Sequence, residues 1–520
     1  MENTNQNPQQ PVQPIQPVPP VQTFQPVQPY YYTPVPPTPP FPTAKRELIF
    51  GVLAVIFSLL LCNFTLFGGF NLGFAIAAVA CIACVVAYLY TSGHRLDGYS
   101  AALLWLSVVI VIGFARSDDS FVKFVMVCFL LLSVNLALCL MAGQNRRNPA
   151  GFTSLADPFR AVFMLGLGEL SPAFRGLGTL FREGGPAVKK SAAVLVGLAI
   201  ALPVLCVMIP LLMSADAAFS GLVGLLPDFE LGELIVTVIF GAAGACVLYT
   251  QGTALNHKPK AEATSVGEKK KLSHLTVNTV LGAVCAVYVV YLLSQLAYFV
   301  GGFSGILPEE FTLAQYARRG FFEMAWLCAI DLSVIALAVG LVNKREGCAP
   351  LATRLLCLFI GLVTVFFVVT ASAKMGMYIG SYGLTRLRVL TEVIMVFLGI
   401  ATVMVCLWLF VPKLPYMKAI LLIALTMGAV TLWADVDTVV AAYNVSAYQS
   451  GTLDSVDVYY LGTLGDGAIP YIAELTEDSD PSTAASARRI ILDHGPDFSD
   501  FRSWNFADWY ATDLIWQMVD

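Results

Sequence analysis

The sequence predicts an all-α, polytopic integral membrane protein with about eleven transmembrane helices, in a range of about ten to twelve. Hydrophobic residues make up 57% of the 520 residues and charged residues only 12%, and the mean hydropathy is +0.73. An ordinary soluble domain has about 25% charged residues. This chain therefore has too few charges to cover water-soluble cores of this size, and a soluble enzyme is excluded for most of its length.

Stretches free of Asp, Glu, Lys and Arg place the transmembrane helices, because about 20 apolar residues cross a bilayer. The first stretch, from Glu47 to Arg95, breaks at Gly68 and Gly69 and predicts two helices. Each later stretch predicts one helix; a further helix, over 320–343, contains acids in its interior. In chain order these segments are Asp97–Arg116, Lys123–Arg146, Lys190–Asp216, Glu233–Lys258, Lys271–Glu309, 320–343, Arg354–Lys374, Glu392–Lys413 and Lys418–Asp435.

The distribution of basic residues predicts the orientation. Most of the 30 Lys and Arg residues fall in loops that share one side of the membrane if the N-terminus is cytoplasmic. Basic loops stay in the cytoplasm. We therefore expect a cytoplasmic N-terminus, an extracytoplasmic C-terminus and a location in the cell (cytoplasmic) membrane.

The sequence predicts four segments along the chain. Residues 1–44 are rich in Pro and Gln and predict a disordered cytoplasmic tail, with PxxP units that could bind a proline-recognising partner. Residues 45–190 predict a first bundle of four membrane helices plus a cytoplasmic loop with an amphipathic segment, and residues 191–435 predict a main membrane domain of seven helices. Residues 436–520 predict an acidic domain of five helical segments on the outer face.

Cysteine and histidine offer no catalytic or cofactor pattern. The 12 cysteines are absent from the acidic C-terminal segment, so no structural disulfide is expected there. Cys81 and Cys84 form a CxxC within an apolar span, where a thiol is usually a packing residue. No HExxH, GxSxG or P-loop pattern is present, so we predict no catalytic residue, metal site or cofactor. Basic clusters lie at membrane borders, which argues against a nucleic-acid partner and for contact with the lipid bilayer.

Ionisable residues within or beside the spans form the candidate site, because they are costly in lipid. They are Arg318, Arg319, Glu323, Asp331, Lys374, Tyr382, Arg386, Arg388 and Glu392. One interpretation is structural. Arg319 pairs with Glu323, and Arg388 with Glu392, on one helix face, or the arginines bind lipid phosphates. The other is that the cations converge on an anionic solute or lipid headgroup. Asp331 lies deeper, where an unpaired carboxylate is expected to be protonated and could relay protons.

Three motifs carry a resemblance. They are YARRGFFEM at Tyr316–Met324, YGLTRLRV at Tyr382–Val389 and DVDTVVAAYNV at Asp435–Val445. Over roughly residues 190–475 the chain resembles an uncharacterised family of bacterial polytopic membrane proteins, catalogued as a domain of unknown function. The resemblance implies an integral protein of a bacterial cytoplasmic membrane and implies no activity.

Three functions remain open. The first, which we slightly prefer, is transport or handling of a small anionic or lipid-linked solute, with Asp331 as a proton site. The second is a non-catalytic envelope sensor or scaffold, and the third is a membrane-embedded transferase. Many carriers contain inverted repeats with broken helices at matching places. Pro203 and Pro210 interrupt the fifth predicted span and have no matching pair later, which favours the sensor.

Overall fold

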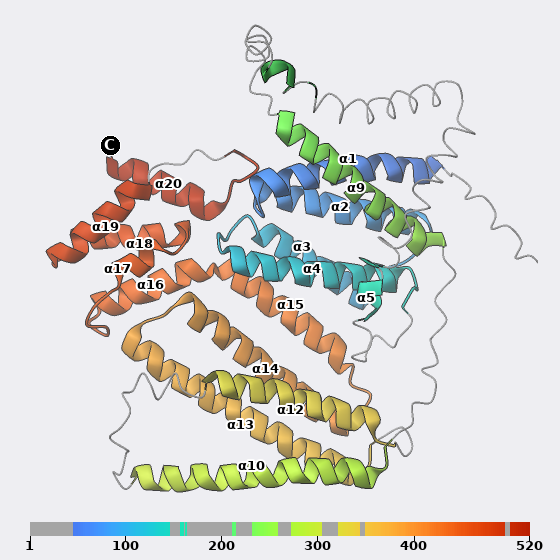
Figure 1. The fold of residues 1–520 in the computed structure, drawn as a ribbon, viewed down its shortest axis with the longest axis vertical. Coiled ribbons are helices and arrows are strands. Elements are labelled where there is room, and N and C mark those ends of the chain that lie inside the picture. The colour runs from blue at the N-terminus through green and yellow to red at the C-terminus, as the bar shows by residue number, and fades with distance from the viewer. Residues whose placement is uncertain are drawn as a thin grey trace, which may run out of the picture. The chain divides into compact units, whose positions relative to one another are not determined.

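The computed structural model describes residues 45–145, 156–160, 162–163, 208, 211–214, 231–257, 272–303, 321–343, 349–494 and 500–519. This part of the chain is helical (Figure 1). Its one β-type contact is an isolated bridge between Leu272 and Val342. The all-α class is therefore confirmed for the described residues.

Nine helices in the described ranges are long and apolar enough to cross a membrane. Each coincides with a stretch predicted from the sequence. They are α1 (Lys45–Gly68), α2 (Leu72–Thr91), α4 (Ser120–Met141), α9 (Leu231–His257), α10 (His274–Phe303), α12 (Phe321–Leu341), α13 (Leu351–Tyr382), α14 (Arg386–Phe410) and α15 (Tyr416–Ala434). A tenth apolar helix, α3 (Gly98–Gly113), has 16 residues.

The predicted count of eleven is not confirmed. The third predicted span is the short helix α3. The fifth, Lys190–Asp216, lies almost entirely outside the described residues, as does most of the predicted amphipathic segment, Pro158–Leu170, which begins within α5 (Ala156–Arg160). Residues 1–44 lie outside them as well. Another difference concerns Lys374, which we placed beyond the end of a span. It lies within α13, because that helix continues to Tyr382 and ends at Gly383, where a φ of +73° stops it.

One group of membrane helices consists of α1, α2, α3, α4, α9 and α15. In Figure 1, α9 crosses α1 and α2, and it packs on both. Helix α3 packs against α4 and α15. Polar side chains cap its start, since Asp97 and Ser100 form a reciprocal capping box. The short α3 is thus held inside the group by its neighbours.

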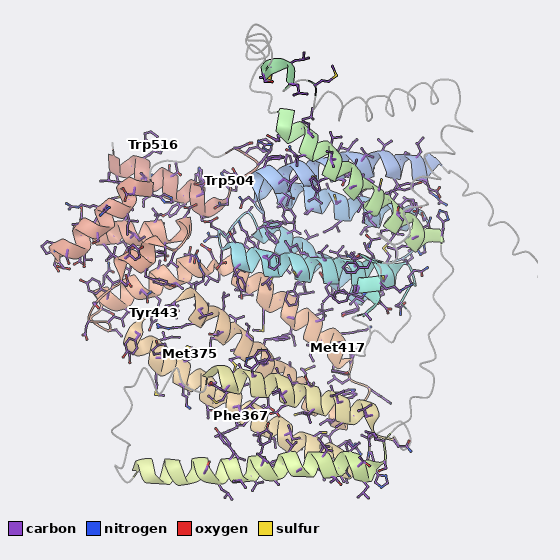
Figure 2. The ribbon with its side chains drawn as sticks, in the orientation of Figure 1. Phe367, Met375, Met417, Tyr443, Trp504 and Trp516 are labelled. Carbon is purple, nitrogen blue, oxygen red and sulfur yellow. The ribbon has the colours of Figure 1, made fainter. Side chains whose placement is uncertain are left out.

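A second group consists of α10, α12, α13 and α14. Its core is built around Phe367 of α13, which is fully buried (Figure 2). Tyr288 and Tyr291 of α10 meet the Phe367 ring edge-on. Helix α14 also packs against α15, so the two groups are joined there.

The C-terminal residues form five helices, as the sequence predicts. They are α16 (Val436–Gln449), α17 (Val458–Gly462), α18 (Ile469–Glu474), α19 (Pro481–His494) and α20 (Phe506–Val519). A short 3-10 turn, Asp466–Ala468, precedes α18. One continuous hydrophobic core runs from α2, α3, α4 and α15 into these helices. The C-terminal helices are therefore packed on the membrane helices and share their core.

Candidate functional site

The structure places the predicted site residues in three locations. Arg318 and Arg319 lie outside the described residues. Glu323 is exposed on the first turn of α12, while Asp331 is buried in the middle of that helix. The other five residues lie around the junction of α13 and α14; they are Lys374, Tyr382, Arg386, Arg388 and Glu392.

Arg386, at the first turn of α14, binds two buried carboxylates. Its Nε donates to Asp437 Oδ1 at 2.7 Å and its Nη2 to Asp437 Oδ2 at 2.5 Å, a bidentate pair. Its Nε also lies 3.3 Å from Asp119 Oδ2. The backbone N–H of Arg386 donates to Tyr460 Oη at 2.9 Å. Arg386 thus joins α14 to α4, α16 and α17.

Two of the three motifs that carry the family resemblance meet at this point. Arg386 belongs to YGLTRLRV and Asp437 to DVDTVVAAYNV. Leu384 and Asn444, from the same two motifs, form a second pair: the Leu384 N–H donates to Asn444 Oδ1 at 2.6 Å, and Asn444 Nδ2 donates to the Leu384 carbonyl at 2.8 Å. These motifs therefore hold the turn before α14 against α16.

Arg388 has a different partner from the one the sequence suggests. Its Nη1 donates to the carbonyls of Tyr382, at 3.1 Å, and Gly383, and its guanidinium lies 4.1 Å from the centre of the Tyr378 ring. The C-terminus of a helix carries partial negative charge. Arg388 therefore caps the end of α13, and no ion pair joins it to Glu392 among the described residues. Glu392 Oε2 is buried without a hydrogen-bond partner in that part of the chain.

Several carboxylates lie near one another beside Arg386: Asp119 and Asp437 contact it, and three more interact electrostatically with one another and with Lys123. We call this group the border cluster; its members are Asp118, Asp119, Asp435, Asp437 and Asp466, with Lys123 and Arg386 as cations. Asp119 caps α4 by accepting from the N–H groups of Phe121 and Val122. Lys123 is buried, and its Nζ donates to Asn71 Oδ1 at 2.5 Å.

Asp435 is the fully buried residue between α15 and α16. Its φ of +54° is unusual for a residue other than glycine. Its carboxylate accepts from Ser117 Oγ at 3.0 Å and Thr438 Oγ1 at 2.5 Å. A Cβ added at Gly467 would collide with that carboxylate and with Thr438. The chain therefore needs a glycine beside Asp435.

Burial shifts the titration of the border cluster. Burial, together with the charge of Asp466, raises the pKa of Asp118 to about 6. Burial also raises the pKa of Asp435. The pKa of His494 in α19 is raised because its ring binds Asp466, with Nε2 3.0 Å from Oδ1. Asp118 thus binds its proton in mildly acidic solution.

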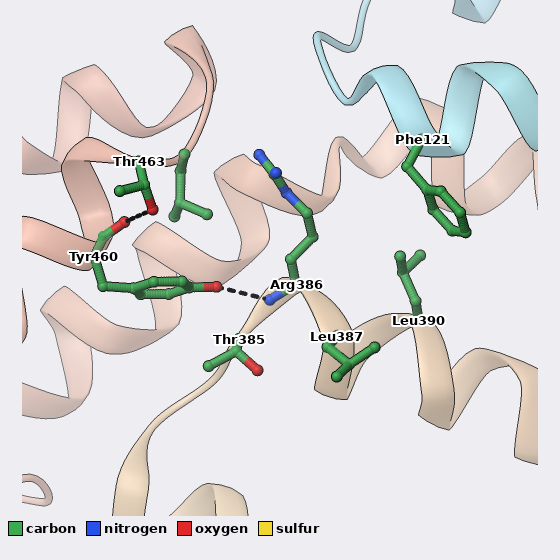
Figure 3. A pocket seen from close by; sticks show the side chains of 8 residues that line it. Phe121, Thr385, Arg386, Leu387, Leu390, Tyr460 and Thr463 are labelled. Carbon is green, nitrogen blue, oxygen red and sulfur yellow. Dashed lines mark hydrogen bonds between the residues drawn. The ribbon is translucent and has the colours of Figure 1, made fainter.

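A pocket of about 420 Å³ lies beside Arg386 (Figure 3). Apolar and polar residues both line it. The apolar ones are Phe121, Leu387, Leu390 and Leu464, and the polar ones are Thr385, Arg386, Tyr460 and Thr463. Leu387 is 61% exposed, at the start of a helix that is long and apolar enough to cross a membrane. The pocket therefore opens where apolar helix surface meets polar helix ends.

Asp331 occupies a second polar position, inside the group of α10, α12, α13 and α14. Its Oδ1 accepts from Tyr288 Oη at 2.5 Å, and its Oδ2 lies 2.8 Å from Thr364 Oγ1. Neither of these partners belongs to the border cluster, so Asp331 forms a separate site. Within the described ranges, no group of three or more His, Cys, Asp or Glu residues could hold a metal ion.

The border cluster was missed from the sequence alone, apart from Arg386. The acids lie in separate segments, and sequence spacing does not show that the C-terminal helices fold back onto the ends of α3 and α14. A partial signal was present, because Asp435 and Asp437 open one of the three motifs.

Nine apolar helices of membrane-spanning length in the described ranges make this chain a multi-pass membrane protein. It belongs to the family described as Domain of unknown function (DUF4153), whose profile matches residues 98–475. The match begins well before residue 190, where we expected it, so α3, α4 and the carboxylates between them are part of the family domain. It also continues through α18. Comparison with curated proteins and with solved structures gives no match.

Proposed function

We propose that this membrane protein binds and handles or transports an amphiphile with an anionic headgroup, which is a lipid or a lipid-linked solute. The binding site is the pocket beside Arg386, which we call the border pocket. The observation that carries the proposal is the mixed lining of the pocket, which contains four apolar and four polar residues. Its apolar residues suit an alkyl chain and its polar residues suit a headgroup. Because Leu387 is exposed on a membrane helix, a lipid could enter the pocket from the bilayer.

The charges around Arg386 narrow the headgroup. Nε and Nη2 face Asp437, whereas Nη1 makes no hydrogen bond within the described part of the chain, and the side chain is 37% exposed. The guanidinium could therefore accept one more anionic oxygen. With Asp119 and Asp437 beside it, the local net charge is already negative. A singly charged phosphodiester fits this setting better than a phosphate with two charges.

We further propose a cytoplasmic N-terminus in a bacterial cytoplasmic membrane. Two cations of loops that we predict to be cytoplasmic lie at one end of the bundle. Arg46 Nη1 donates to the Thr91 carbonyl, at the end of α2, over 3.3 Å, and Lys418 lies over the ring of Tyr99, in the first turn of the next helix, α3. Positive charge at one end supports this orientation. The pocket, at the opposite end, would then face outwards.

A sensor or scaffold is the second candidate. It is supported by the core that runs from the membrane helices into α16–α20 and by the Arg386 pair that fastens them. A change in the C-terminal helices would thus reach α4 and α14. A proline-binding partner for residues 1–44 stays a prediction outside the described residues. No group in the described ranges supports the transferase.

Filling the pocket tests the proposal. The purified full-length chain in a neutral detergent would be melted with added phosphatidylglycerol or phosphatidylcholine. We expect phosphatidylglycerol to raise the melting temperature more than phosphatidylcholine does, because only its headgroup carries a net negative charge. Leu387→Trp should abolish this difference by occupying the pocket.

The matched control is Leu407→Trp. Leu407 is 52% exposed on the same helix and does not line the pocket. This variant should keep the response to phosphatidylglycerol. An equal response in all three proteins would refute lipid binding at the pocket and leave the sensor as the better candidate.

A further inference from the structure

A carboxyl group lies at the middle of a membrane helix. Asp331 is the central residue of α12 (Phe321–Leu341), and only 1% of it is exposed. At 1.5 Å per residue, it lies about 15 Å from either end of the helix. A charge at that depth is costly, and such residues are rare in membrane spans unless they have a function.

The surroundings of Asp331 contain hydroxyl groups and apolar side chains. The helices around it contribute Tyr288 from α10 and Thr364 from α13. The core beside them consists of Cys328, Ile335, Ile360 and Phe367, among others. Within the described residues, no Lys, Arg or His forms an ion pair with Asp331. An ionised Asp331 would thus have two hydroxyl groups and no counter-ion.

The hydroxyl of Thr364 has one proton and two neighbours. Its Oγ1 is 2.8 Å from Asp331 Oδ2 and 2.9 Å from the Ile360 carbonyl, one turn earlier in α13. If Thr364 donates to Ile360, a protonated Asp331 completes the set by donating to Thr364 Oγ1 and accepting from Tyr288. Every proton then has an acceptor. If Asp331 is ionised, Thr364 must leave Ile360 to stabilise it.

We propose that Asp331 is a proton-binding site within the membrane, and that loss of its proton loosens α10 from α12 and α13. The Tyr288 contact ties α10 to α12, while the outer face of α10 is exposed, with Val287 and Val290 among its residues. A carboxylate in this buried contact would be stabilised by water, and a movement of α10 would admit water. The site takes a proton from solution and needs no other ligand.

The other titratable groups in or against this core are thiols and the phenol groups of Tyr291 and Tyr378, which are neutral at ordinary pH. Cys285 of α10 and Cys328 of α12 lie close to Asp331, Cys357 belongs to α13, and Cys406 of α14 packs against Gly361. Thiols are neutral in such a core at ordinary pH. They add no charge to offset an ionised Asp331.

A pH series with an isosteric variant tests this site. The full-length chain and Asp331→Asn would be melted in detergent between about pH 5 and pH 9. We expect equal melting temperatures at low pH and a growing deficit in the unmodified chain as the pH rises, up to tenfold in the unfolding constant per pH unit beyond the onset. The side chain of the asparagine variant cannot ionise, so its own curve supplies every other pH effect. A difference that stays constant over the range would overturn the proposal.

A second measurement needs no variant. A lipid-soluble carbodiimide adds to a protonated carboxyl: the carboxyl oxygen bonds to the central carbon, and the carboxyl proton moves to a carbodiimide nitrogen. Mass spectrometry of the unmodified chain in lipid vesicles should find the adduct on Asp331, with a yield that falls as the pH rises. No adduct at any pH, or a yield that does not fall, would contradict a proton site at this position.

Discussion

Replacing Arg386 by methionine removes the cation that lies between α14, α4 and α16 while it keeps a side chain of similar length. Asp437 and Asp119, each with 1% of its side chain exposed, would lose their ion-pair partner. Breaking a buried ion pair costs about 3–5 kcal/mol. Because 37% of the Arg386 side chain is exposed, solvent screens part of the interaction, and we expect the lower end, about 3 kcal/mol.

An equilibrium constant changes about tenfold per 1.4 kcal/mol. The loss of about 3 kcal/mol therefore changes the equilibrium between docked and released C-terminal helices more than about a hundredfold. Limited proteolysis of the full-length chain in mild detergent measures it, since released helices α16–α20 are cleaved faster. Asp437→Asn removes one of the stranded charges, so the double variant Arg386→Met with Asp437→Asn should cost clearly less than the sum of the single variants. Additive costs, or a single-variant cost near zero, would refute the role assigned to Arg386.

Two further predictions concern the border cluster and His494, which binds Asp466 of that cluster. Asp118 has its pKa raised from 3.8 to about 6, and the pKa of His494 is raised above 6.5; the folded state therefore holds both protons more tightly than the unfolded state. The stabilisation is present at low pH and is lost as pH rises, for Asp118 between pH 3.8 and about 6 and for His494 above 6.5. Proteolysis of α16–α20 should accordingly speed up across this range, with a smaller change in Asp118→Asn; slower cleavage at higher pH would contradict the assignment. Gly467→Ala should destabilise the chain by about 1–3 kcal/mol, because its Cβ would meet Asp435 and Thr438. The control is Gly376→Ala, where a Cβ meets nothing within 4 Å; it should be neutral or stabilising. Thermal melts of both variants measure the difference, and equal effects would show that crowding is not the cause.

Much of the helix pattern could be predicted because it depends on local composition. The helix starts follow from local chemistry as well: Asp97, Asp119 and Thr385 cap α3, α4 and α14 with side chains three or fewer residues from the amides they bind. The end of α13 was predicted too early. The residues after Lys374 contain no proline, and the helix continues through Gly376 and Gly380 to Tyr382.

The candidate site was predicted only in part, for a physical reason. Sequence spacing shows which residues can meet on one helix, and so it suggested that Arg388 pairs with Glu392. The structure gives Arg388 the carbonyls at the end of α13, which are close because the chain turns sharply at Gly383. The residue spacing along a single helix does not show which residues are neighbours across a turn or between helices.

The sequence by itself determined that this chain uses lipid as a solvent, since its apolar stretches are too long and too free of charge for water. It also determined which segments become helices, and it marked Asp331 and Arg386 as costly residues that need a reason. Only the tertiary structure decided what surrounds them: two hydroxyl groups for Asp331, and for Arg386 carboxylates from α4 and α16. The solvent preference is a sum over local residues, whereas a counter-charge depends on which distant segments pack together.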